Sequence, residues 1–408
     1  MKKLFFLFSL FLILTLPIVA QQEKPSFGIS FSGFVKTDIM YDTRQTTALR
    51  EGHFLLYPAP ELMDKNNEDI NSKSNLNILS IQTRLTGKIT APDAFGAKTS
   101  GQIEGEFFGT TDGDINGFRL RHAFLKLDWE NTSLLVGQTW HPMFVAEMFP
   151  GVVSFNTGAP FQPFSRNPQI RFSYAANEFK FILAAMAQRD FQSNGPGGFS
   201  STYLRNSVIP NLHAQVQYLS NGNLAGVGID FKKLTPRLVT TKNIQTDESL
   251  SGFSALGFVK LNLDPVTVKA QGIYGQNIPD LMQIGGYAVK STDAATGVET
   301  YITLSNFTFW GEISTGKQTE YALFFGYSKA LGASNNITGA YYGRATDIEN
   351  VLRISPRIQF NSEKTRISTE VEFTSAGYGT PNGINKGKIE NVQTVSNLRL
   401  LLAFYYFF

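Results

Sequence analysis

The sequence contains no cysteine, carries little net charge, and has no long hydrophobic run beyond its first 20 residues. The absence of cysteine excludes a disulfide-stapled secreted domain and a thiolate metal site. A formal charge of +3 over 408 residues is too small for a dedicated nucleic-acid binder, so no nucleic-acid partner is expected. Aromatic residues make up 13% of the chain and include 35 Phe, which excludes a disordered chain. A soluble all-β or mixed protein and a membrane protein built from strands remain.

The first 20 residues predict a cleaved export signal. Lys2 and Lys3 precede an apolar run over residues 4–16, and Ala20 is the small residue expected before a cleavage site. We expect cleavage after Ala20, which leaves residues 21–408 as a single domain. The alternative is an uncleaved membrane anchor, but the run is shorter than the about 20 apolar residues that cross a bilayer as a helix.

Alternation of apolar and polar residues predicts strands along the rest of the chain. In the first run, Phe27–Tyr41, the odd positions are mostly apolar, while Ser30, Lys36 and Asp38 lie on the other face. This run exceeds ten residues, whereas strands of soluble proteins average about 5–6 residues and transmembrane strands need about 9–11. Comparable runs lie at 79–89, 102–107, 179–188, 212–218, 227–232, 352–360, 366–373 and 393–408, and less regular ones start near residues 117, 133, 169, 252, 266, 301 and 321.

The connections between these runs alternate in length. Short ones fall at 91–95, 130–132, 176–178, 220–223, 264–265, 316–318 and 361–364, and long ones at 42–75, 141–168, 190–210, 240–251, 278–300, 332–346 and 377–392, with 110–116 as the short exception. Short turns at one end and long loops at the other are typical of outer-membrane barrels. The sequence therefore predicts an all-β, up-and-down, antiparallel transmembrane β-barrel of about 16 strands. A soluble sandwich or propeller is the alternative, in which the oily faces meet in a dry core.

The last strand predicts how the chain reaches its membrane. Its alternating face, Leu398 to Tyr406, ends in the terminal aromatic Phe408. This ending is similar to the sorting signal read by the outer-membrane barrel insertion machinery, which would then be a partner. The alternative is that this ending is only the last hydrophobic strand of the sheet and carries no signal. The cell outer membrane, with its bilayer and lipopolysaccharide, is the expected location.

The long loop 141–168 is the third on the long-loop side and is unusually apolar. A freely solvated loop would not carry so many Phe, Met and Pro residues, so we expect it to fold inward and narrow the lumen of the barrel. Its candidate constriction residues are Glu147, Phe149, Phe161 and Arg166. A surface loop packed on itself, or a latch at a subunit interface, is the alternative.

The strand phase turns many charged side chains toward the lumen, where about sixteen strands leave an aqueous channel. The candidate lining residues are Lys36, Asp38, Arg84, Lys88, Glu104, Glu106, His122, Arg171, Arg353, Arg357, Arg366, Glu370 and Arg399. Two interpretations stay open. A strip of arginines favours anions, or the arginines pair with Asp38, Glu370 and Glu372 on the same wall.

Three short motifs resemble the DcaP-like porins of Gram-negative bacteria: Gly33-Phe34-Val35-Lys36-Thr37-Asp38, Arg119-Leu120-Arg121-His122-Ala123-Phe124 and Gly137-Gln138-Thr139-Trp140. The resemblance covers mainly residues 27–175. It implies a homotrimeric, sixteen-stranded diffusion porin that passes small anionic solutes, with Lys36, Arg119, Arg121 and His122 on the wall. Arg119 and Arg121 share phase with apolar Ala123, so either a bulge intervenes or both arginines lie above the lipid band.

Catalytic and metal-binding motifs are scarce. None of the four histidines, His53, His122, His141 and His213, has a metal-ligand spacing. Asp112 and Asp114 offer oxygens to calcium, although a turn explains them as well. The expected function is passive diffusion of small hydrophilic solutes, with no enzyme activity, metal or cofactor. The alternatives are a barrel hydrolase and a secreted soluble β-protein that binds glycans or partners.

Overall fold

The computed structural model describes residues 27–408, so the export signal predicted over residues 1–20 lies outside the described residues. Its elements, in chain order, are β1 (Gly28–Asp42), β2 (Thr46–Leu49), β3 (Phe54–Pro58), η1 (Ile70–Ser72), β4 (Asn75–Leu79), β5 (Arg84–Ala94), β6 (Ala97–Glu106), η2 (Asp112–Asp114), β7 (Arg119–Asp128), β8 (Thr132–Trp140), β9 (Arg166–Ala176), β10 (Phe179–Met186), α1 (Thr202–Asn206), β11 (Asn211–Ser220), β12 (Asn223–Leu234), β13 (Leu250–Asn262), β14 (Val266–Gln276), η3 (Pro279–Leu281), β15 (Gly285–Thr292), β16 (Glu299–Thr303), β17 (Ser305–Thr315), β18 (Thr319–Gly332), β19 (Tyr341–Arg344), β20 (Ile348–Ser362), β21 (Thr365–Asn382) and β22 (Lys388–Phe407). No helix among residues 27–408 is long and apolar enough to span a membrane.

The main sheet closes into a barrel because its first strand pairs with its last. β1 pairs antiparallel with β22 from Phe34↔Phe407 to Asp42↔Arg399, and on its other edge with β4 and β5. The sheet holds 17 strand segments, of which β4 and β5 are two parts of one barrel strand, interrupted at 80–83. The described residues thus form a 16-stranded antiparallel barrel, as the periodicity predicted. The backbone groups at Gly33 and Phe408 exchange hydrogen bonds of 3.2 Å, so closure extends to the last residue.

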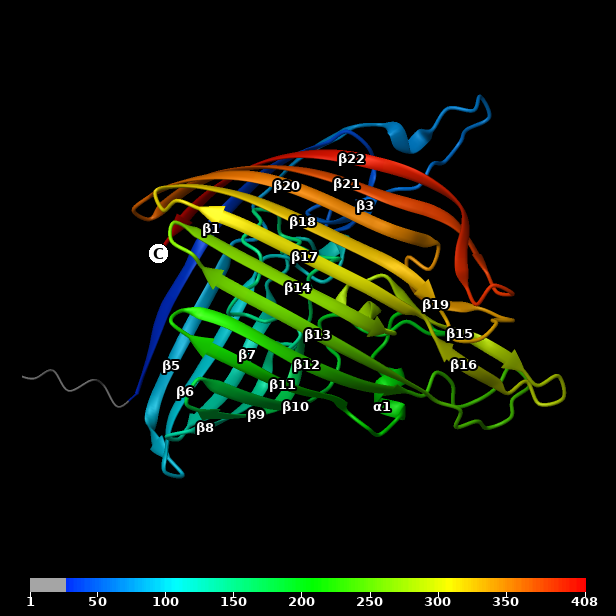
Figure 1. Cartoon of the computed structure of the whole chain (residues 1–408), viewed down its shortest axis with the longest axis horizontal. Coiled ribbons are helices and arrows are strands. Elements are labelled where there is room, and N and C mark those ends of the chain that lie inside the picture. The colour runs from blue at the N-terminus through cyan, green and yellow to red at the C-terminus, as the bar shows by residue number, and fades with distance from the viewer. Residues whose placement is uncertain (1–26) are drawn as a thin grey trace, which may run out of the picture.

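The two ends of the barrel differ, as the connection lengths predicted. Short turns and the C-terminus lie at one end, and the long loops gather at the other (Figure 1). The predicted loop 377–392 is a correction: β21 and β22 continue as a paired hairpin, so that only residues 383–387 turn between them. Alternation fails there because both faces of this extension project beyond the membrane, where no apolar stripe is needed.

The barrel wall has an oily outer face and a polar inner face. On the outside, Phe31, Leu183 and Ile229 are 65%, 58% and 63% exposed, whereas the inward-facing Lys36 and Arg399 are fully buried. This is the reverse of a soluble sandwich, whose apolar residues would fill the core. Hydrocarbon outside accounts for the pattern, since only a closed sheet satisfies its backbone groups within a bilayer.

Inward-folded loops fill much of the lumen. The largest apolar cluster joins loop 141–165, the hairpin β2–β3 of loop 43–74, and residues 278–284 of loop 277–304, and includes Phe54, Phe155, Phe161, Phe164 and Met282. The inward fold of the third long loop is therefore confirmed. The first long loop, which the sequence predicts only as a long connection over 42–75, folds inward as well.

An arginine in place of Ile229 tests which solvent meets the outer face. If hydrocarbon surrounds this side chain, Ile229→Arg lowers the free energy of unfolding by about 2–4 kcal/mol. Ile384, 85% exposed in the 383–387 turn, is the matched control, and its replacement by Arg changes stability by no more than about 0.5 kcal/mol. Urea unfolding in lipid vesicles measures both; equal, small effects at the two positions would contradict a membrane-facing wall.

Candidate functional site

Wall carboxylates accept hydrogen bonds from loop 141–165, two from backbone N–H groups and one from a side-chain amide. Gly151 N donates to Glu312 Oε2 at 2.6 Å, and Val153 N donates to Glu370 Oε2 at 2.7 Å. Asn156 Nδ2 donates to Glu372 Oε1 at 2.8 Å. A carboxylate that accepts backbone N–H groups forms strong charge-assisted hydrogen bonds. Acidic residues of the wall therefore position the loop that crosses the lumen.

Two buried arginines of the wall also hold the loops, by donating hydrogen bonds to loop carbonyl oxygens. Arg353 donates to the carbonyl oxygens of Ala159 and Leu56, both at 2.8 Å, and thus joins loop 141–165 to the hairpin β2–β3. Arg399 donates to Asp42 Oδ2 at 2.7 Å and to the Gly52 carbonyl oxygen at 2.8 Å. Both side chains are 1% exposed or less. The apolar run 54–57, inside an otherwise polar loop, is the sequence signal that would have revealed this hairpin.

A polar cavity of about 650 Å³ lies below the loops, at the short-turn end of the lumen. Loop residues 149–154 form its roof, and strand residues next to the short turns, such as Asn262 and Ser314, form its sides. We call it the vestibule. Six cationic side chains line it, against two carboxylates: Arg84, Arg121, Lys260, Lys269, Arg357 and Arg366 against Glu104 and Glu320.

The vestibule cations differ in how completely they are neutralised. Arg357 pairs with Glu312 at 2.7 Å and with Glu320 at 2.8 Å, and Lys269 pairs with Glu312 at 2.9 Å. Arg366 donates instead to the amide oxygen of Asn361. Among the described residues, no carboxylate lies within 4 Å of the nitrogens of Lys260 or Arg366. These two residues therefore contribute most to the positive potential of the space.

A bulge in β7 brings extra charge to the wall. Glu104 pairs with His122 and Gly105 with Leu120, so that Arg121 has no partner in the register. The extra residue turns Arg121 inward, where it contacts Glu104 at 2.7 Å and Glu106 at 2.6 Å. Arg119 also reaches Glu106, at 3.0 Å. Of the two explanations for these arginines, the bulge is correct.

The remaining candidates fall into two groups. The first group is buried away from the vestibule. Lys36 and Asp38 form an ion pair at 3.0 Å, and Arg166 pairs with Asp190 at 2.6 Å. The ring of Phe161 packs against the guanidinium group of Arg353. Phe149 lines the vestibule and is 43% exposed. Nearer to water, Glu147 pairs with Lys180 at 3.3 Å, Lys88 is exposed, and Arg171 donates to the Gln169 side chain and the Trp140 carbonyl oxygen.

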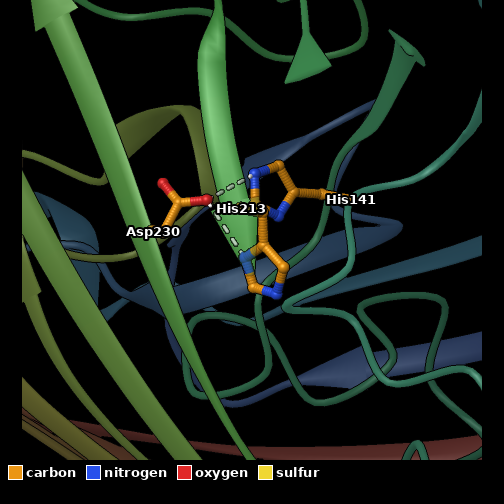
Figure 2. Close-up of side chains that lie close together, drawn as sticks. All are labelled: His141, His213 and Asp230. Atoms are coloured by element: carbon orange, nitrogen blue, oxygen red, sulfur yellow. Dashed lines mark hydrogen bonds and ion pairs between the residues drawn. The ribbon is translucent and has the colours of Figure 1, made fainter. Parts of the chain in front are cut away.

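Three buried side chains that are distant in sequence meet where loop 141–165 leaves the wall. Figure 2 shows the rings of His141 and His213 turned toward the carboxylate of Asp230. Asp230 Oδ2 lies 3.4 Å from His141 Nε2 and 3.2 Å from His213 Nδ1. Donor atoms this close could hold a metal ion. The cluster could not be predicted from spacing along the chain, because β11, β12 and the loop are brought together only by the fold.

The hydrogen bonds around His141 argue for a network without metal. Its Nδ1 accepts the backbone N–H of Met143 at 3.2 Å, so the proton of the neutral ring lies on Nε2, the atom that faces Asp230. Burial lowers the pKa of His141 to about 4, which keeps the ring neutral. A metal-bound histidine uses its unprotonated nitrogen and donates from the other. The cluster is thus built to fasten the loop to β11 and β12.

Comparisons with known proteins identify the fold. No protein-family model and no curated protein matches the chain. The outer membrane channel DcaP of Acinetobacter baumannii is 16% identical, with 94% of this chain and 98% of that chain covered and a TM-score of 0.68. An anion-selective porin from Comamonas acidovorans (12% identical, 94% and 100% covered, TM-score 0.54) and the trimer form of the outer membrane protein OmpT of Vibrio cholerae (10%, 94% and 100%, 0.55) are also similar. These likenesses confirm the predicted barrel fold and its resemblance to DcaP-like channels.

Removal of the shared carboxylate tests the histidine network. Asp230→Ala removes the acceptor of the Asn211 amide and of the His213 ring, leaves these buried groups short of a partner and lowers stability by about 1–3 kcal/mol. Asp128→Ala, which removes a partly exposed carboxylate paired with Lys126, is the control and costs less than about 1 kcal/mol. The readout is the temperature at which the folded band is lost in gel electrophoresis. EDTA and Zn²⁺ leave that temperature unchanged; a shift with either would establish a metal site instead.

Proposed function

We propose that this chain is an outer-membrane porin through which small hydrophilic anions diffuse passively. The observation that carries the proposal is the vestibule, a polar space inside a transmembrane barrel. Its lining holds six cationic side chains and two carboxylates, and two of these cations, Lys260 and Arg366, have no carboxylate within 4 Å among the described residues. A ring of basic side chains attracts anions and repels cations. The similar porin from Comamonas acidovorans is described as anion-selective, which supports the same preference here.

The position of the vestibule favours permeation over storage of a ligand. It lies at the short-turn end, directly below the loop that narrows the lumen, so a solute that passes the loop enters it next. The guanidinium group of Arg366, whose Nε donates to the Asn361 amide oxygen, keeps N–H donors that match the two oxygens of a carboxylate or the oxygens of a phosphate. Such groups select by charge without a covalent step.

The enzyme alternative has less support. A barrel hydrolase needs a nucleophile beside a base, but the His141–His213–Asp230 cluster is buried and its hydrogen bonds are used to hold a loop. Of the two other buried histidines, His53 contacts Asp38 within the packed hairpin region. His122 lies 3.8 Å from Glu104 and shares a hydrogen bond of 3.0 Å with the Thr139 hydroxyl. We therefore propose a protein without catalytic residues, cofactor or metal. Hydrolysis of ester or peptide substrates by the purified barrel would contradict this.

The proposal includes location and assembly. We propose that the chain is exported by a signal that is cleaved after Ala20. The insertion machinery then recognises the strand that ends at Phe408, and the barrel resides among the lipids and lipopolysaccharide of the outer membrane. A homotrimer is proposed from the resemblance to DcaP-like porins and from the trimer form described for OmpT. Light scattering of the detergent-solubilised protein distinguishes a trimer from a monomer.

Neutralising the two least compensated cations tests the origin of selectivity. Lys260→Gln combined with Arg366→Gln removes positive charge from the vestibule without leaving a carboxylate unpaired. We expect open channels in planar bilayers, and a reversal potential under a salt gradient that shifts toward cations. Lys65→Gln with Lys73→Gln, exposed on loop 43–74, makes the same change of charge outside the vestibule and leaves the reversal potential unchanged. An unshifted potential in the Lys260/Arg366 variant would refute this origin of selectivity.

Replacement of Arg353, which donates to both inward loops, tests whether these loops set the width of the passage. Arg353→Lys keeps the charge beside Glu372 but loses the planar fork that reaches Ala159 and Leu56 together. We expect higher and noisier single-channel conductance, because both inward loops lose a common attachment. Arg237→Lys, in an ion pair with Glu299 on the outer loops, is the control. Unaltered conductance in Arg353→Lys would mean that other contacts hold the loops in place.

A further inference from the structure

The outer wall of the barrel carries an apolar furrow that begins under helix α1. At its upper end, a hollow of about 700 Å³ lies between the wall and the chain segment 204–210, which overhangs β8, β9 and β10. The side chains of Ile170 and Ala185 also line a second hollow of about 500 Å³, below the first. The furrow is thus roofed at the long-loop end and open along the membrane-facing wall.

Small residues on the outer face keep the furrow open. Ala185, Ala214 and Ala255 project outward from β10, β11 and β13, between larger neighbours such as Leu183 and Ile229. Leu183 pairs with Ala214, and Ile229 pairs with both Ala214 and Ala255, so Ala214 and Ala255 lie in one row across the strands, and Ala185, which pairs with Leu212, lies one step closer to the long loops. A third hollow of about 590 Å³ continues the line toward the short turns. The shape is that of a trough for an extended hydrocarbon chain.

Uncompensated cations lie at the upper end of the furrow or two residues beyond its lining. Arg205 of α1 lines the first hollow, and Arg189, just beyond β10, is exposed. Lys233 stands at the end of β12, on the same outward phase as Ile229. Thr235 N donates to the Tyr203 carbonyl oxygen at 2.9 Å, which ties α1 to the end of β12. Within residues 27–408, no carboxylate lies within 4 Å of the side-chain nitrogens of these three cations, unlike the neighbouring Arg166 and Lys232, which pair inside the barrel.

We propose that this furrow is a binding site for a phosphate-bearing acyl lipid of the membrane leaflet on the long-loop side. One acyl chain lies along Ala185 and Ala214, and the phosphate accepts hydrogen bonds from Arg205 and Arg189. The occupant follows from the chemistry of the two ends, since an apolar trough that opens to hydrocarbon takes a chain, and arginines at headgroup depth take a phosphate. Long loops face outward in such barrels, so the lipid belongs to the outer leaflet.

The site has a structural consequence for the loops. Helix α1 is only five residues long, and its buried Tyr203 and Leu204 pack against Leu234 at the end of β12 and Tyr287 of β15 in the outer loops. A lipid held between α1 and the wall would fix this loop cluster over the barrel mouth. This site is independent of what passes through the lumen, because the side chains that shape the furrow, such as Ala185 and Ala214, face away from the lumen.

Lipid titration of the purified, delipidated barrel tests the proposal by native mass spectrometry. The probes are a diphosphorylated, multiply acylated glucosamine lipid and its dephosphorylated form, each added in the same detergent. The wild-type barrel is expected to retain the phosphorylated probe at least tenfold more tightly than the dephosphorylated one. Arg189→Gln with Arg205→Gln removes that preference, with about a tenfold loss of affinity, whereas Lys290→Gln with Lys386→Gln, on other exposed loop positions, does not.

Filling the furrow tests the acyl-chain half of the site. Ala185→Phe places a ring between Ile170 and Leu212 and is expected to abolish retention of the probe, while Ala225→Phe, on the same outer face but outside the furrow, leaves it intact. Both substitutions face hydrocarbon, so heat-resistant folding is kept and is verified by gel mobility. Equal retention of both probes, unchanged binding by the arginine variant, or dissociation of oligomers by Ala185→Phe would each overturn the proposal; the last would assign the furrow to contact with a second copy.

Discussion

The whole structure depends on one constraint, that no backbone amide in the wall is left without a partner. A bilayer supplies no water to such groups, so the sheet must close on itself. The pairing of β1 with β22 meets this demand, and it extends to the terminal residue, where Gly33 and Phe408 exchange two hydrogen bonds. Closure also fixes the orientation of every side chain. Once the register of one strand is set, alternate residues meet either hydrocarbon or the lumen, and a shift by one residue would place Lys36 or Arg399 in lipid.

The polar interior that follows from closure explains why the loops fold inward. Loop 141–165 and the hairpin β2–β3 are apolar on the sides where they meet each other, yet their backbones need partners. The wall supplies them: Glu312 and Glu370 accept N–H groups, and Arg353 and Arg399 donate to carbonyl oxygens. A buried ion pair alone is weak support for stability. Here the charged groups also satisfy backbone atoms that would otherwise be buried without partners, and the charge of the wall is largely consumed in this way.

The sequence was sufficient for the fold because membrane strands are long and strictly two-faced. The runs beginning at Phe27 and ending at Phe408 predicted strands within a few residues, and the apolar content of 141–168 predicted an inward loop. Sequence alone missed contacts that only the closed barrel creates. The hairpin at 54–57 looked like part of a solvated loop, and the meeting of His141 with Asp230 spans 89 positions. Arg121 sat on the wrong phase because a bulge adds one residue to one strand and none to its partner. Strand phase placed Arg353 and Arg366 on one wall, but it could not distinguish an arginine that holds loops from one that faces water.

That distinction bears on how selectivity arises in a barrel of low net charge. Counting lumenal arginines overstates the potential, since Arg353, Arg357 and Arg399 each lie against carboxylates. What a passing solute meets is the remainder, the few cations whose partners are neutral, such as Arg366 beside Asn361. The same reasoning applies to the outer wall, where Arg205 matters because its neighbours inside the barrel are paired and it is not. In both places the charge that can attract a ligand is on a cation that has no carboxylate partner. Which cations lack a partner depends on which carboxylates are used to bind the loops.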